Sequence, residues 1–177
     1  RELTDVFQIQ TAVADEIAKA LQLNFSAEER SAVDQQASAN PEAYDLYLRA
    51  RRYGDYWAQE NDDLRKAREL LVRAVALDPE FAEAHGRLAV VAGVQYSRND
   101  HTAERLAQSE QAIARALELD PQLPSAHFAK AHNEYWVHNR FEVALADLDR
   151  ALAREPNYAE ALSMRGWLYR RLGRWDE

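Results

Sequence analysis

Hydrophobic residues recur along the chain at spacings of three and four, and one such pattern returns before each of three prolines. Aligned on Pro79, Pro121 and Pro156, the columns twelve, eight and five residues upstream hold Ala67, Leu71 and Ala74, then Ser109, Ile113 and Ala116, then Ala144, Leu148 and Ala151. This spacing places each triplet on one face of a helix. Each proline predicts a helix end nearby, because the residue before a proline avoids the helical conformation.

A second amphipathic pattern follows each proline, so the repeating unit is predicted to be a pair of helices. It contains His85, Leu88, Ala89 and Ala92 after Pro79, and Leu162, Arg165, Gly166 and Tyr169 after Pro156. The extra length of the unit that begins after Pro79 falls in "GVQYSRNDHTAE", between its two helices. The stretch "GDYWAQENDD" interrupts the preceding unit in the same way. These insertions either lengthen helices or form loops.

The repeat is absent before Pro41, although the helical pattern persists. Val6, Ile9, Val13, Ile17, Ala20 and Leu21 predict an amphipathic helix over 3–23. A capping box of Ser26 and Glu29 opens a short helix to about residue 36, and Asn40 is predicted to cap a helix that begins at Pro41. We therefore expect an N-terminal helical segment over residues 1–38, as a cap or the tail of a preceding domain. An array of three full repeats and an unfinished fourth follows over residues 39–177.

Composition agrees with a helical protein and excludes several classes of function. Of the 177 residues, 47% are hydrophobic and only five each are glycine and proline, so a helical core is expected. The net charge of −8 disfavours binding to nucleic acid. There is no cysteine, which fits a reducing, cytoplasmic location, and no apolar run long enough for membrane insertion. A first residue other than methionine predicts a fragment of a longer protein.

The sequence contains no recognisable motif for catalysis or metal binding. The five glycines stand singly, so no phosphate-binding loop is predicted, and no nucleophile elbow is present. The five histidines include no pair four residues apart with a supporting carboxylate, so no metal site is expected. His85 and His127 occupy equivalent points of two repeats, which favours a packing role. We expect no catalytic residue, no cofactor and no metal in this chain.

The order of large, small and aromatic residues resembles the tetratricopeptide repeat. The stretch "AEALSMRGWLYRRLGRWDE" carries the resemblance best, through Leu162, Gly166, Tyr169, Gly173 and Trp175. It implies an all-α fold, an α-α superhelix of antiparallel helix pairs with an N-terminal helical cap. The whole chain also resembles the junction of large bacterial signalling proteins that join a TolB-like domain to a repeat array. Their output domain is a nucleotidyl cyclase, a winged-helix regulator or a Ser/Thr kinase.

The resemblance also implies a concave groove, lined by the first helix of each pair, that takes a peptide or a partner's helix. In the third unit, burying Phe128, Ala131 and Tyr135 requires one extra residue to be absorbed near Pro124, and this register turns Asn133 and Trp136 toward the groove. Inter-repeat packing is the competing role for the aromatic residues. The groove candidates are Tyr47, Arg51, Arg87, Val90, Asn133, Trp136, Trp167 and Arg170.

The sequence thus predicts a noncatalytic protein-interaction scaffold within a larger bacterial signalling protein. The alternative is a regulatory or self-association domain of a nucleotidyl cyclase or a similar output enzyme. Capture of a C-terminal carboxylate, as some relatives achieve with two lysines and two asparagines, is disfavoured. Arg87 and either Ala129 or Lys130 stand where those side chains would be needed.

Overall fold

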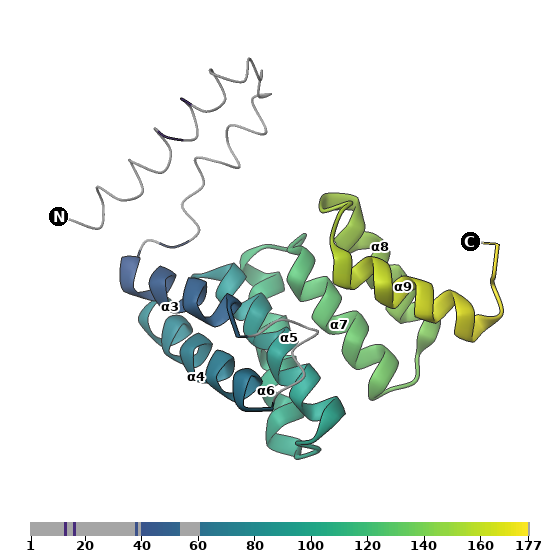
Figure 1. Cartoon of the computed structure of the whole chain (residues 1–177), viewed down its shortest axis with the longest axis horizontal. Coiled ribbons are helices and arrows are strands. Elements are labelled where there is room, and N and C mark those ends of the chain that lie inside the picture. Colours follow the sequence, from purple (N-terminus) through teal and green to yellow (C-terminus); the bar gives the residue numbers. More distant parts are fainter. Residues whose placement is uncertain (1–12, 14–15, 17–37, 39, 54–60, 177) are drawn as a thin grey trace.

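The computed structural model describes residues 13, 16, 38, 40–53 and 61–176, and every element within these ranges is a helix (Figure 1). The helices are α3 (Pro41–Arg51), α4 (Asn61–Leu77), α5 (Ala82–Arg98), α6 (Ala103–Leu119), α7 (Pro124–Trp136), α8 (Phe141–Arg154) and α9 (Ala159–Leu172). The helices predicted over 3–23 and 26–36 lie outside the described residues, apart from Val13 and Glu16. So does most of the "GDYWAQENDD" stretch.

The helices form a stack of pairs, as the repeated pattern predicts. Helix α3 packs on α4, α5 on α6, and α7 on α8, while contacts of α5 with α4 and α7 join one pair to the next. Helix α9 packs on α8 at the C-terminal end of the stack (Figure 1). Among the described helices, none is long and apolar enough to cross a bilayer. The all-α repeat architecture predicted from the sequence is confirmed.

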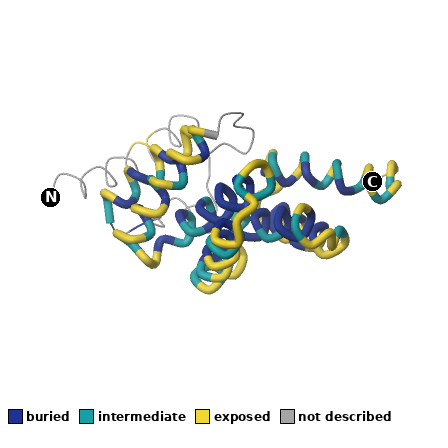
Figure 2. The backbone as a smooth tube through the Cα atoms, turned by 90° about the horizontal axis from the view of Figure 1, so that it is seen from below, coloured by how far each residue is buried: buried dark blue, intermediate teal, exposed yellow. Residues whose placement is uncertain are grey.

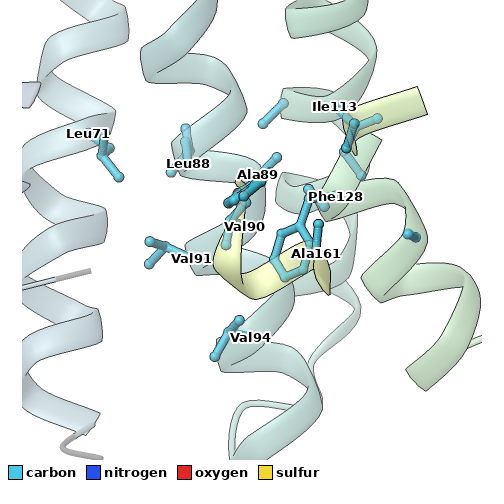
Figure 3. Packing of buried hydrophobic residues seen from close by; sticks show 14 of the residues in the cluster. Leu71, Leu88, Ala89, Val90, Val91, Val94, Ile113, Phe128 and Ala161 are labelled. Atoms are coloured by element: carbon cyan, nitrogen blue, oxygen red, sulfur yellow. The ribbon is translucent and has the colours of Figure 1, made fainter. Parts of the chain in front are cut away.

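The predicted columns form the core of this stack. Ile113 is 8% exposed, and the other eight column residues are completely buried. Figure 2 shows that buried residues concentrate along the middle of the molecule, and Figure 3 shows side chains of α4, α5, α6, α7 and α9 converging there. Small side chains in two columns of three allow this close approach of helices.

The boundaries of the helices follow from the prolines and their neighbours. Asn40 caps α3 as predicted, because its Oδ1 accepts hydrogen bonds from the backbone N–H groups of Glu42 and Ala43. Helices α4, α6 and α8 each end two residues before their proline. The next helix then begins behind a buried apolar residue with no side-chain cap; these residues are Phe81, Leu123 and Tyr158.

The extra residues of the second pair lengthen its helices. Helices α5 and α6 have 17 residues each, whereas α7 and α8 have 13 and 14. The "GVQYSRNDHTAE" stretch therefore contributes the last turns of α5, a short turn and the start of α6.

The register predicted for the third pair is wrong. The Nε2 atoms of His85 and His127 donate hydrogen bonds of 3.1 and 3.0 Å to the carbonyls of Pro79 and Pro121, six residues upstream in each case. The two repeats therefore align without an extra residue. In this alignment Asn133 falls in the column of Val91 and Leu168, which are 1% and 0% exposed.

Asn133 is consequently buried and does not face a groove. It is 4% exposed, and its Nδ2 donates a 3.0 Å hydrogen bond to the Ser109 hydroxyl, which in turn donates to the Ala89 carbonyl at 2.9 Å. Phe128, Ala131 and Tyr135 are nevertheless buried, as predicted.

Val90 is also buried, at 1% exposure, although the sequence places it among the groove candidates. Helix α5 contacts α4, α6 and α7, so it is covered on all sides between Leu88 and Gln95. This enclosed part of α5 has no polar face to offer to a partner, whereas the first turns of the helix, up to Arg87, are less buried.

Candidate functional site

A groove of about 620 Å³ crosses one side of the stack. Its walls come from Tyr47 and Arg51 of α3, Glu83 and Arg87 of α5, residues 123–125 at the start of α7, and residues 154, 155 and 157–160 at the turn into α9. The first and fourth repeats therefore meet at one site, although their residues are about a hundred positions apart in the sequence.

The aromatic wall of the groove rests on the core of the protein. Tyr47 packs against Phe81 with ring centroids 5.0 Å apart, and Tyr158 packs against Phe128 at 5.3 Å. Burial raises the pKa of both tyrosines, so their hydroxyls remain protonated. Both rings are fixed by packing, and they offer rigid surface to a partner.

Charged side chains of both signs lie beside these rings. Arg87 of α5 and Glu160 of α9 form an ion pair of 3.8 Å, with side chains 14% and 17% exposed. Arg51 lies one helical turn after Tyr47, on the same face of α3. Burial raises the pKa of the Glu83 carboxyl, and burial together with the charge of Glu160 raises that of Glu155. The groove is therefore polar, with carboxylates that have lost part of their hydration.

The structure brings together three of the predicted groove residues, Tyr47, Arg51 and Arg87. Three other candidates lie outside the groove wall. Trp136 is 49% exposed and packs edge-on against Tyr135 at 4.8 Å. Trp167 is half-buried against the core, and Arg170 is exposed near the end of α9.

The groove residues between α8 and α9 were missed from the sequence. Glu83 and Glu160 stand at positions that the repeat turns toward the groove, but Arg154, Glu155, Asn157 and Tyr158 belong to the connecting turn. The only sequence signal for them was their position around Pro156, which predicted a helix boundary and gave no indication of a binding surface.

A second polar cluster lies between α7 and α8. The buried Asp147 carboxylate contacts His127 Nδ1 at 3.1 Å, Lys130 Nζ at 3.0 Å and Arg150 at 2.8 Å. Because three cationic or hydrogen-bonding groups share this one carboxylate, it acts as a structural counter-ion. Within the described ranges, no group of three or more His, Cys, Asp or Glu side chains is arranged to hold a metal ion.

Comparison with known proteins agrees with the helix pairs. Residues 133–177 match the tetratricopeptide repeat family model. Over 139 residues the chain is 29% identical to "Putative adenylate cyclase 3" of Rhizobium meliloti (strain 1021). The aligned region covers 77% of this chain and 23% of that protein. The chain thus spans about a quarter of the length of this curated relative. Residues 133–177 thus resemble a tetratricopeptide repeat, and the stacked pairs from α3 to α9 agree with an all-α architecture of repeated helix pairs.

Proposed function

We propose that this array is a noncatalytic interaction module whose groove binds a peptide or a helix of a partner protein, within a larger cytoplasmic signalling protein of a bacterium. Tetratricopeptide repeats generally mediate contacts between proteins. The observation that carries the proposal is the groove itself, in which Tyr47, Arg51 and Arg87 are presented by two separate helix pairs. Tyrosine and arginine are the residue types that most often anchor protein interfaces.

The dimensions of the groove favour a short segment as its occupant. A volume of about 620 Å³ accommodates a few side chains and not a folded domain. The rings of Tyr47 and Tyr158 are already packed, so a partner would order few groove side chains on binding. Trp136, Trp167 and Arg170 remain candidates for partner contacts outside the groove.

The relative's name favours a second candidate, regulation of a nucleotidyl cyclase. In that case the array either couples partner binding to a cyclase domain or brings two cyclase chains together. Light scattering of the intact protein over a range of concentrations separates these roles. A strict monomer at every concentration counts against self-association and leaves partner binding as the route of regulation.

Groove binding is tested with an unbiased library of twelve-residue peptides displayed on phage and selected against the chain. We expect Tyr47→Ala and Arg51→Ala each to weaken the selected peptides by about tenfold in fluorescence anisotropy, because both side chains line the groove. Arg49→Ala is the matched control, since Arg49 is 58% exposed, pairs with Asp45 and lies outside the groove. Equal losses in all three variants would show that the peptides bind elsewhere.

A further inference from the structure

The charges of the groove are not all compensated within it. Its wall contains three arginines and three glutamates, namely Arg51, Arg87, Arg154, Glu83, Glu155 and Glu160. Arg154 pairs with Asp120 and Arg87 with Glu160. Three charged groups are left, Arg51, Glu83 and Glu155, and none of them forms an ion pair with another described residue.

Glu83 is the least hydrated of the three. It lies in the first turn of α5 and is half-buried, and its charged neighbours are Asp120 and Arg154, which already neutralise each other. Burial raises its pKa, and the charge of Arg154 offsets this effect only in part, so the ionised carboxylate would gain from further compensation. A positive group from outside would supply that compensation, at lower cost than in a fully hydrated site.

The surroundings of Glu83 suit an organic cation. Tyr47 lies in the same wall, where the charges of Arg51, Glu83 and Arg87 all act on it, and Tyr158 completes the aromatic surface. Tyrosine rings attract ammonium and guanidinium groups through their π faces, and their hydroxyls accept hydrogen bonds from them. Glu155 adds a second carboxylate at the turn into α9.

The two remaining arginines do not reverse this preference. Arg87 is engaged by Glu160 at 3.8 Å. Arg51 is exposed, so solvent and salt screen its repulsion of an incoming cation, and its guanidinium remains available to bind acceptor groups elsewhere on the peptide. The net charge of −8 over the whole chain also attracts basic partners and accelerates their encounter.

We propose that the groove recognises an arginine or lysine side chain of its protein partner, with Glu83 and Glu155 as counter-ions and Tyr47 and Tyr158 as the flanking surface. This inference rests on the proposed groove function and specifies its ligand. It is opposite in sign to capture of a terminal carboxylate, and it makes Glu83 the residue that determines specificity.

The phage library described above provides the probe. We expect arginine and lysine to be enriched at one position of the selected peptides. The tightest peptide is then synthesised twice, once unchanged and once with citrulline for that arginine, or acetyl-lysine for that lysine. Because either change removes the charge and keeps most of the shape, affinity should fall by about tenfold.

Glu83→Gln and Glu80→Gln form a matched pair of variants. In Glu83→Gln the charged peptide should lose about tenfold in affinity, and its advantage over the neutral peptide should fall below about twofold. Glu80→Gln removes the same charge three residues away, from an exposed side chain outside the groove, and should behave as the wild type. Thermal melting confirms that both variants fold.

The other outcomes separate the two proposals. If selected peptides depend on Tyr47 and Arg51 but bind equally well without the positive charge, the basic anchor is wrong and groove binding stands. The same conclusion follows if acidic residues are enriched. If the library yields no peptide that depends on Tyr47 or Arg51, both proposals fail. If Glu83→Gln and Glu80→Gln weaken the charged peptide equally, the effect comes from overall charge and Glu83 is not the specificity residue.

Discussion

At the scale of single residues, Asp147 shows how this fold uses a buried charge. The residue is completely buried, and its carboxylate is shared by His127 and Lys130 of α7 and Arg150 of α8. A buried carboxylate is tolerated only when it is paired and hydrogen-bonded. The cluster therefore specifies how α7 packs on α8, in addition to the apolar contacts between them.

We expect Asp147→Ala to lower the free energy of unfolding by about 2–4 kcal/mol, because it removes the shared acceptor and leaves the His127 ring without its carboxylate. Asp149→Ala is the control on the same helix. Asp149 is 60% exposed, and its ion pair with Arg165 is long, at 3.4 Å. Its removal should therefore change the free energy of unfolding by less than about 0.5 kcal/mol. Urea denaturation followed by circular dichroism measures both. Similar losses in the two variants would contradict the structural role of the cluster.

At the scale of the helices, two glycines distinguish a closely packed face from an open one. A Cβ at Gly93 of α5 would lie 2.8 Å from Asn133 Oδ1 and 3.2 Å from Ser109 Oγ, whereas a Cβ at Gly166 of α9 would meet nothing within 4 Å. Gly93→Ala should therefore destabilise the protein by about 1–3 kcal/mol.

Gly166→Ala should stabilise the protein by up to about 1 kcal/mol, through helix propensity alone. Thermal melting tests both, and a higher melting temperature for Gly93→Ala would contradict the packing of α5 against α6 and α7.

The helices and their core columns were predictable because the signal lies within each helix. Spacings of three and four in α4, α6 and α8 indicated which faces are buried, and the prolines indicated where those helices end. The register of α7 was not predictable in this way. Asn133 was assigned to the groove by a register that absorbs one extra residue near Pro124. Its partner Ser109 belongs to another helix, and a hydrogen bond between two helices leaves no periodic pattern in either sequence.

At the scale of the whole molecule, the groove was only partly predictable. Tyr47, Arg51 and Arg87 followed from positions within a repeat, but Glu155 and Tyr158 line the same groove because of the way the stacked pairs are arranged in space. That arrangement depends on how successive pairs pack, and no single repeat encodes it.

The centre of the stack also predicts how the whole array responds to acid. His132 is buried in α7, and this burial lowers its pKa to about 4, from 6.5. Between these values the unfolded chain binds a proton that the folded chain excludes, so stability falls as the pH falls through this window. The full effect is roughly 3 kcal/mol. Unfolding measured from pH 7 to 4 should show this loss in the wild type, and His132→Phe should lack that share of it. Parallel pH profiles for the two proteins would contradict the burial of a neutral ring.

Arg51 belongs to the first repeat of the described stack and Glu155 to the turn before its last helix, yet they line the same groove, and the charge of Arg51 lowers the pKa of Glu155. The width of that groove is therefore a cumulative quantity, the result of every angle between the pairs that separate them. A small rotation between two successive pairs, such as the one at the turn around Leu123, adds to the rotations between the other pairs. Their sum determines the width of the groove. Substitutions of buried residues between the pairs can thus change the affinity for a ligand that they do not contact.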